Sequence, residues 1–379
     1  MAIRRACPRI AGPIAAAMLL VLSVSAGGGA VAATGWSLAD GPRSWRFPTD
    51  HGAHPAFRTE WWYFTGNLSD EAGSEYGYQL TFFRRGLRPE PAVPGNAWSV
   101  RDVYFAHLAV TDVSRGRFLM AERASRPGPG LAGAAGDRLD VHLLGWTARM
   151  DGSLIRLRAA AEALDLELDL EPSRPVVLHG DKGLSRKGPR PGQASYYASL
   201  TRLETRGRLG SGGGGAPVTV KGTSWFDHEF GSGALPEDLA GWDWLGLRLD
   251  DGRDLMIYRL RRADGSAAPE SSGTLVAPDG TASAVSMAGF AWEVLDRWRS
   301  PRSGGDYPCR TRLRLPAAGI ELEIVPLVDD QELRTPGSTR VTYWEGAVAA
   351  KGTSRGRTVS GRGYVEMTGY AGRLGGTIL

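Results

Sequence analysis

Three ionisable residues stand next to one another within the aromatic and glycine-rich segment 222–231: Asp227, His228 and Glu229. Histidines and desolvated carboxylates are the side chains that most often transfer protons near neutral pH. The segment is therefore a candidate for general acid/base chemistry, with a satisfied polar network as the alternative. If the segment is a strand, Asp227 and Glu229 point to one face and His228 points to the other.

Glu60 is a further candidate because it directly precedes Trp61 and Trp62. A carboxylate among aromatic side chains is desolvated, which raises its pKa unless a cation pairs with it. Glu60 is thus either part of a site or half of a buried ion pair with Arg58 or Arg84.

Two later carboxylates allow the same pair of interpretations. Glu345 follows a Tyr-Trp pair, and Glu366 stands in a glycine- and tyrosine-rich segment. Each is either a site carboxylate or half of an ion pair.

A zinc site is the alternative use of the histidines. His51 and His54 are three residues apart and, with His228 or Glu229, would form a His/carboxylate set. Glycine and proline make the first segment a loop, so nothing fixes its distance from residue 228. We expect no metal and no cofactor, and we expect His51 and His54 to hold the loop by hydrogen bonds.

Aromatic residues cluster in the same segments as the ionisable ones. They form barrel core, or they line a barrel lumen or an inter-barrel cleft that holds an apolar small molecule. The candidate ligand-binding residues are Trp61, Trp62, Tyr63, Tyr196, Tyr197, Trp225, Trp242, Asp243 and Trp244.

Residues 1–33 have the pattern of a secretion signal. Arg4, Arg5 and Arg9 precede an apolar stretch from Ile14 to Val24, and small residues end the segment at Ala33. We expect cleavage near Ala33 and a mature chain that is secreted or periplasmic, with no integral membrane span.

The net charge argues against nucleic acid as a partner, and the cysteine content excludes an internal disulfide in the mature chain. The chain has 45 basic and 41 acidic residues, and the signal contains three of the arginines and no acid. The mature chain then has 42 basic residues and a net charge of about +1, which argues against nucleic acid as a partner. Its single cysteine, Cys309, has no partner for an internal disulfide, so core burial must supply the stability.

The mature sequence reads as β throughout. Segment 164–171 alternates leucine with acidic residues, which is the period of a half-buried strand. A tryptophan-led hairpin with an acidic turn and an Arg-Arg end begins at Trp62 and recurs at Trp244. We predict an all-β fold of two consecutive antiparallel barrels, divided near residues 232–239.

Three motifs in order resemble the AttH/carotenoid 1,2-hydratase-type family. They are Phe47-Pro48-x-Asp50-His51-Gly52-x-His54-Pro55 with Glu60-Trp61-Trp62-Tyr63, then Trp225-x-Asp227-His228-Glu229-x-Gly231 with Trp242-Asp243-Trp244, and finally Gly361-x-Gly363-Tyr364-x-Glu366-x-Thr368-Gly369-Tyr370.

The resemblance implies two tandem lipocalin-like (calycin) barrels, which we place at residues 34–231 and 232–379. Members are often labelled predicted secreted hydrolases, and the family includes a hydratase that adds water across a terminal alkene of carotenoids. In that hydratase the resemblance implies an Asp acid on a strand soon after the His-containing motif. Here the corresponding strand has Tyr258 and no carboxylate, which argues against carotenoid hydration itself.

Two functions follow as hypotheses. The first is an enzyme that hydrates, isomerises or hydrolyses an apolar, lipid- or terpenoid-like molecule by acid/base chemistry. Its candidate catalytic residues are Asp227, His228, Glu229, Glu60 and Tyr258. The second is a noncatalytic extracytoplasmic carrier for an apolar ligand. The concentrated charge at residues 227–229 favours the enzyme.

Overall fold

The structure is a computed structural model, and it describes residues 35–90, 99–162, 164–211 and 216–372. The predicted signal segment lies outside these residues. Gly35–Leu379 form one compact unit. In the described part of the chain, no helix is long and apolar enough to cross a membrane.

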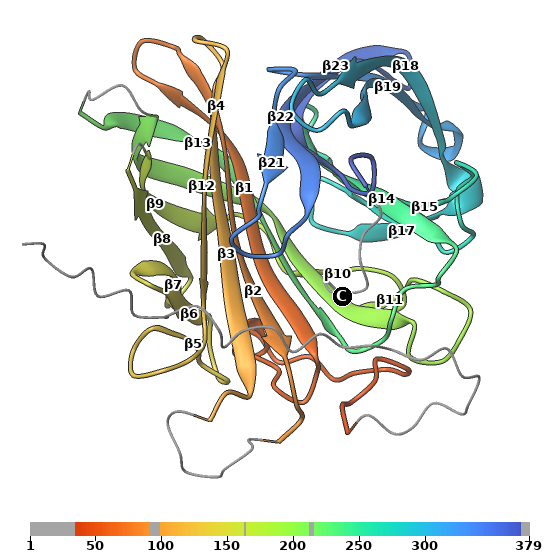
Figure 1. The fold of residues 1–379 in the computed structure, drawn as a ribbon. Helices are drawn as coiled ribbons and strands as arrows, with labels where there is room; N and C mark the ends of the chain where they lie inside the picture. Colours follow the sequence, from red (N-terminus) through yellow and green to blue (C-terminus); the bar gives the residue numbers. More distant parts are fainter. Residues whose placement is uncertain (1–34, 91–98, 163, 212–215, 373–379) are drawn as a thin grey trace, which may run out of the picture. The chain divides into compact units, whose positions relative to one another are not determined.

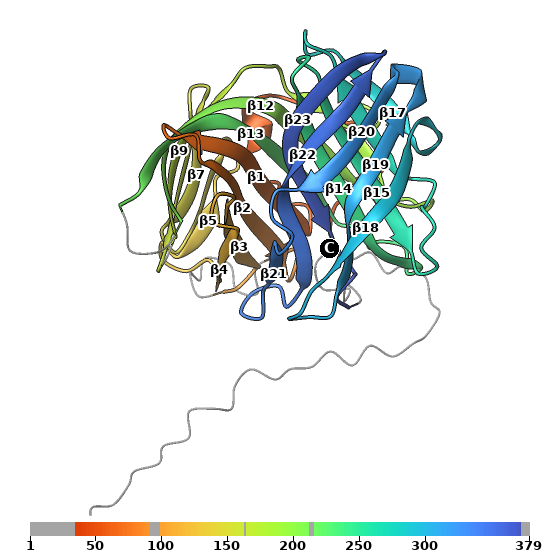
Figure 2. The same ribbon diagram turned by 90° about the horizontal axis from the view of Figure 1, so that it is seen from above.

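Two antiparallel sheets hold the described strands (Figure 1, Figure 2). The first sheet consists of β1 (Thr59–Asp70), β2 (Glu75–Gly86), β3 (Asp102–Asp112), β4 (Arg117–Ser125), β5 (Ala132–Ala134), β6 (Asp140–Leu143), β7 (Trp146–Asp151), β8 (Leu154–Ala161), β9 (Leu164–Pro172), β10 (Val177–Leu178), β11 (Leu184–Arg186), β12 (Ala194–Ser211) and β13 (Val218–Gly231). The second consists of β14 (Leu239–Leu249), β15 (Asp254–Arg262), β16 (Ser272–Val276), β17 (Ala282–Ser286), β18 (Ala291–Arg299), β19 (Asp306–Leu315), β20 (Ile320–Pro326), β21 (Glu332–Arg334), β22 (Thr342–Ser354) and β23 (Arg357–Met367). Short 3-10 turns lie at η1 (Thr49–His51), η2 (Met287–Gly289) and η3 (Pro316–Ala318).

Hydrophobic alternation explains why these segments are strands. In β9, Leu164, Leu166, Leu168 and Leu170 are buried, while the acidic residues between them are exposed or half-buried. Each sheet curls around its own apolar core into a barrel-like half. The predicted all-β fold with two antiparallel barrels is confirmed.

The two sheets repeat one topology. In each, the first strand lies between its hairpin partner and the last strand, so β1 pairs with β2 and β13, and β14 pairs with β15 and β23. The recurring tryptophan-led hairpins correspond to β1–β2 and β14–β15. β13 ends at Gly231 and β14 begins at Leu239, and the division into domains between them stays a prediction.

Alternation along β1 separates two environments. Trp62 and Phe64 point into the core of the first barrel. Tyr63 points the other way and joins Trp244 and Tyr258 of the second sheet in a separate aromatic cluster. The outward faces of the two sheets therefore meet, with β1 against β23 and β2 against β22.

Candidate active site

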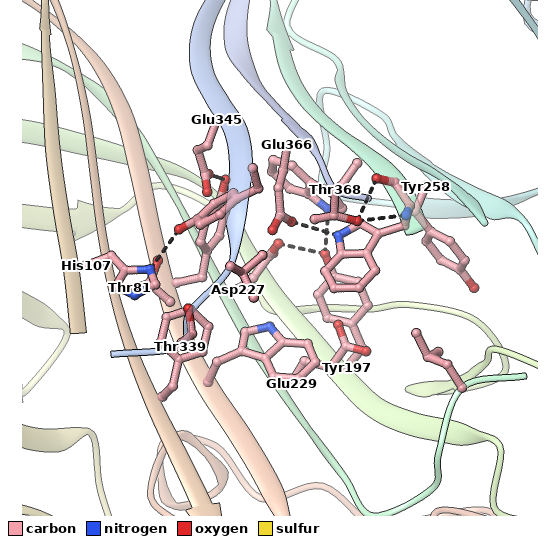
Figure 3. A pocket seen from close by; sticks show the side chains of 18 of the residues that line it. Thr81, His107, Tyr197, Asp227, Glu229, Tyr258, Thr339, Glu345, Glu366 and Thr368 are labelled. Carbon is pink, nitrogen blue, oxygen red and sulfur yellow. Dashed lines mark hydrogen bonds between the residues drawn. The ribbon is translucent and has the colours of Figure 1, made fainter. Parts of the chain in front are cut away.

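A pocket lies between these outward faces (Figure 3). It contains about 1010 Å³ of space, which includes space open to solvent. Its aromatic lining consists of Trp61, Tyr63, Phe83, Tyr197, Trp242, Trp244, Tyr258 and Tyr343. Of the two locations left open by the sequence, the structure favours the inter-barrel cleft over a barrel lumen.

Asp227 enters the pocket from β13. Tyr197 donates a hydrogen bond to its Oδ2 at 2.6 Å, and Trp225 Nε1 donates to its Oδ1 at 2.5 Å. Ser199 also donates to Oδ1. Burial raises the pKa of Asp227 to about 7, against the lowering effect of these three bonds, and the charge of Glu229 adds to the rise. Asp227 is thus held in one orientation, and its pKa lies near neutral pH.

Glu366 enters the pocket from β23. Trp242 Nε1 donates to its Oε2 at 2.9 Å, and no other donor among the described residues reaches this carboxyl group. Burial raises its pKa to about 7, and the charges of Glu229 and Asp227 contribute, although the Trp242 bond opposes the rise. The other oxygen is consequently available to a bound molecule.

Glu345 lies directly across from Glu366 on the neighbouring strand β22. Tyr63 donates a hydrogen bond to Glu345 Oε1 from the first sheet. Burial raises the pKa of Glu345 well above its ordinary value, and the charge of Glu366 adds to it. Two neighbouring carboxyl groups in a desolvated site cannot easily ionise together, so the pair retains a proton near neutral pH. Figure 3 shows Asp227, Glu345 and Glu366 directed into the same pocket.

Glu229 has a different environment on the same face of β13. Its Oε1 lies 3.2 Å from Lys187 Nζ and accepts a hydrogen bond from Ser195. The Lys187 ammonium also lies 4.0 Å from the ring centroid of Tyr258, whose hydroxyl donates to the Arg186 carbonyl at 3.1 Å. Burial alone would lower the pKa of Lys187, but the charge of Glu229 has the opposite effect, and the net result is a pKa above the ordinary value. Glu229 and Lys187 therefore form a buried ion pair in the pocket wall.

Glu60 and His228 lie on the opposite face, away from the pocket, as the predicted alternation requires for His228. Arg84 Nε donates to Glu60 Oε2 at 3.1 Å, so the ion-pair interpretation with Arg84 describes Glu60. His228 Nε2 and His54 Nδ1 approach Glu60 Oε1 at 2.9 and 2.8 Å. Burial would raise the pKa of Glu60, but the bonds with His228 and His54 and the Arg84 charge hold it well below its ordinary value. Glu60 is a permanent carboxylate at neutral pH.

Four of the predicted ligand-binding residues do not line the pocket. Trp62 lies in the first barrel and donates to the His51 carbonyl at 3.0 Å, and Tyr196 donates to the Gly41 carbonyl at 2.9 Å. Asp243 lies on the opposite face of β14 from Trp242 and Trp244, and it pairs with Arg259 at 2.8 Å. Trp225 is fully buried behind Asp227, which it orients. For the first three, the two-residue period of a strand turns the side chain to the other face.

Glu345 and Glu366, which the sequence left as site carboxylates or as halves of ion pairs, both line the pocket, and neither has a cation partner among the described residues. The structure also brings to the pocket two residues for which the sequence offered no signal. Lys187 follows β11, and His107 of β3 contacts the Tyr343 hydroxyl at 2.8 Å. Only the pairing of distant strands brings these two residues to the pocket.

Comparison with known proteins places this architecture in a family. A family model described as AttH-like matches residues 38–370. A search of curated proteins gave no match.

Solved structures share the fold over most of the chain. An AttH protein (NE1406) from Nitrosomonas europaea has 35% sequence identity and a TM-score of 0.79, covering 88% of this chain and 99% of that one. Kievitone hydratase from Nectria haematococca has 14% identity and a TM-score of 0.66, covering 86% and 92%. CghA with Sch210972 has 15% identity and a TM-score of 0.50, covering 83% and 90%. These similarities confirm the lipocalin-like fold that the motifs implied.

Proposed function

The chain belongs to the AttH-like family, and from this premise we propose that it is an enzyme that protonates an unsaturated apolar small molecule in the inter-sheet pocket. The proposed reaction is hydration of a double bond or its isomerisation. The observation that carries the proposal is Glu366, a carboxyl group with a pKa of about 7 and one oxygen unoccupied by any described donor.

Glu366 has the properties of a general acid. A proton donor is most effective when its pKa lies near the working pH, because a large fraction is then protonated and the proton is still readily transferred. Trp242 fixes one carboxyl oxygen, so the other oxygen presents the proton in a defined direction. An ordinary exposed glutamate would be ionised and could not protonate carbon.

The proposed step balances with water as the only co-reactant. The O–H bond of Glu366 breaks as its proton bonds to one alkene carbon, and positive charge develops on the other carbon. Water attacks that carbon and loses a proton to the Asp227 carboxylate, which is held by Tyr197 and Trp225. In isomerisation, a neighbouring carbon loses the proton instead. Exchange with solvent restores both carboxyl groups.

The aromatic walls suit such an intermediate. The faces of Trp and Tyr rings attract cations, and the effect is largest where water is excluded. Tyr63 and Trp244 meet edge to face at 5.3 Å, which fixes their orientation in the wall. Kievitone hydratase, which shares the fold, acts as a hydratase by name, and this supports hydration as the reaction class.

The test uses candidate alkenes in D2O. Terpenoid alcohols and prenylated phenols are incubated with the protein, and mass spectrometry records the addition of one water or the uptake of deuterium on carbon. We expect turnover with at least one class, its loss in Glu366→Gln, and unchanged turnover in Glu237→Gln at an exposed position. Glu366→Gln should still bind the alkene. If the wild type binds alkenes but never adds water or deuterium, the protein is a carrier and the proposal is wrong.

We also propose that the protein acts outside the cytoplasm after cleavage near Ala33. The charged, apolar and small-residue pattern of residues 1–33 supports this. N-terminal sequencing of the protein from its native host should begin near residue 34, and an intact N-terminus would contradict the proposal.

A further inference from the structure

A second group of ionisable side chains lies away from the pocket, inside the first barrel. His54, Glu60 and His228 each offer one ligand atom, and these atoms all lie within 4.8 Å of one another. Glu60 and His228 are fully buried, and His54 is nearly so. The group joins the loop before β1 to β1 and to β13.

Asp50 orients both imidazole rings. Its side-chain Oδ1 lies 3.3 Å from His54 Nε2, and its backbone carbonyl lies 3.1 Å from His228 Nδ1. A carbonyl oxygen can only accept, so His228 Nδ1 carries the proton of that bond. Asp50 receives hydrogen bonds from Arg43 and from the Arg46 backbone N–H, which hold it as a carboxylate, so His54 Nε2 donates as well.

The remaining ring nitrogens, His54 Nδ1 and His228 Nε2, both point at Glu60 Oε1. With Asp50 accepting from the far side, neutral rings direct the lone pairs of His54 Nδ1 and His228 Nε2 at Glu60 Oε1, from 2.8 and 2.9 Å. Lone pairs on three atoms at such distances repel one another, so either a further proton on each ring or one metal ion must lie between the nitrogens and Oε1. Metal-binding histidines have this arrangement, in which the second ring nitrogen donates to a carboxylate or a backbone carbonyl.

Each carboxylate around this group already has a guanidinium partner. Arg84 pairs with Glu60 Oε2 and with Asp102, Arg43 pairs with Asp50, and Arg101 lies 3.8 Å from Asp102. The evidence for a cation is therefore the arrangement of the three ligand atoms and not an excess of negative charge. Arg84 donates to Oε2 of Glu60, and the His54 backbone N–H donates to both oxygens, at 3.0 Å to Oε1 and 2.9 Å to Oε2. Oε1 is also the oxygen that the two imidazole rings approach.

From this geometry we propose that His54 Nδ1, Glu60 Oε1 and His228 Nε2 bind one Zn²⁺ ion. Two imidazoles and one carboxylate are a zinc ligand set, and a water molecule would complete the tetrahedron. Donors about 2.0–2.1 Å from zinc lie roughly 3.3 Å apart, so each nitrogen needs to move only a few tenths of an ångström away from Glu60 Oε1, which it now approaches at 2.8 or 2.9 Å. The site differs from the set considered from the sequence, because Glu60 takes the place of His51 beside His54 and His228, and it departs from the expectation of no metal.

The proposed ion would fix the loop before β1 against β1 and β13. His228 is adjacent to Asp227, whose side chain leaves the other face of β13 into the pocket. The site would therefore stiffen the strand that carries a pocket carboxylate without touching a bound molecule. The proposal is independent of the proposed reaction, since it concerns metal content and stability alone.

The test measures zinc in tag-free protein by inductively coupled plasma mass spectrometry and by calorimetric titration after chelator treatment. We expect about one zinc per chain, a lower melting temperature after chelation, and recovery on adding zinc. His54→Gln and His228→Gln should lose the stoichiometric ion, whereas His142→Gln on β6 should keep it. Asp50→Ala should weaken binding by about 10–100-fold, since it removes the group that orients His54.

A crystallographic measurement covers the case in which the histidine variants fail to fold. Anomalous diffraction at the zinc edge from wild-type crystals should give a peak beside Glu60 Oε1. Protein that takes up no zinc, or a peak elsewhere, overturns the proposal and places a further proton on each imidazole instead. Equal uptake by well-folded His54→Gln and His228→Gln overturns it as well.

Discussion

Replacing Glu366 by glutamine should stabilise the folded protein at pH 8 while it removes the proposed acid. Burial raises the pKa of Glu366 from 4.5 to about 7, so the folded state holds this proton more tightly than the unfolded chain does. The contribution of the Glu366 carboxyl group to the free energy of unfolding is fully present below pH 4.5, and it is lost as the pH rises through about 7. Glutamine is neutral at every pH and keeps an oxygen that accepts the Trp242 hydrogen bond.

The magnitude follows from the two pKa values. The difference between 4.5 and about 7 corresponds to at most about 3 kcal/mol at pH 8. The side chain is partly reached by solvent from the pocket, which screens its charge, so we expect about 1–2 kcal/mol. The gain should become small at pH 5, where the folded protein already holds the proton. Loss of the Glu366 charge should also lower the pKa of Glu345, which that charge raises.

Urea unfolding at pH 5 and pH 8, followed by tryptophan fluorescence, measures the effect. Glu237→Gln, at an exposed position, is the control and should change the free energy of unfolding by less than about 0.5 kcal/mol at both pH values. A Glu366→Gln variant that is destabilised equally at both pH values would refute the reasoning, because the carboxylate would then carry no penalty for burial.

Three further substitutions test the pocket, the buried ion pair of Arg84 with Glu60, and the apolar core of the first barrel. Trp244→Ala should weaken the binding of Nile red to the pocket at least about tenfold in a fluorescence titration, and Trp36→Ala, outside the pocket, should not. Arg84→Met should lower the free energy of unfolding by about 3–5 kcal/mol because it leaves a buried carboxylate unpaired, whereas the exposed Arg158→Met should change it by less than about 0.5 kcal/mol. Leu166→Ala should cost about 2–5 kcal/mol in the same urea assay, since it opens a cavity in the core; a loss below about 1 kcal/mol would contradict the packing described for β9.

The strands and the alternation of their faces were predictable from the sequence. Alternation of leucine with acidic residues is a local property, and it predicted β9 closely. The same rule predicted that Asp227 and Glu229 share a face that His228 does not, and the pocket lining agrees. The aromatic motifs correctly indicated where an apolar surface lies.

The membership of the site was not predictable in the same way. Glu366 reaches Asp227's neighbourhood only because the outward faces of two separate sheets pack together, and no local pattern encodes that packing. Lys187 lies in the loop after β11 and His107 lies in β3, and neither residue belongs to one of the motifs, although both line the pocket. Glu60 needed the position of Arg84, on the paired strand β2, to be recognised as half of an ion pair.

The sequence by itself determined the β architecture, the repeated hairpins and the facing of Asp227, because side-chain direction in a strand follows from its two-residue period. Tertiary structure decided the chemistry of each carboxylate, because its pKa depends on the groups that surround it from other strands. Glu366 and Glu345 gain protons from burial beside each other, whereas Glu60 stays ionised beside Arg84. Identical side chains in similar aromatic contexts thus take opposite roles once the sheets close around them.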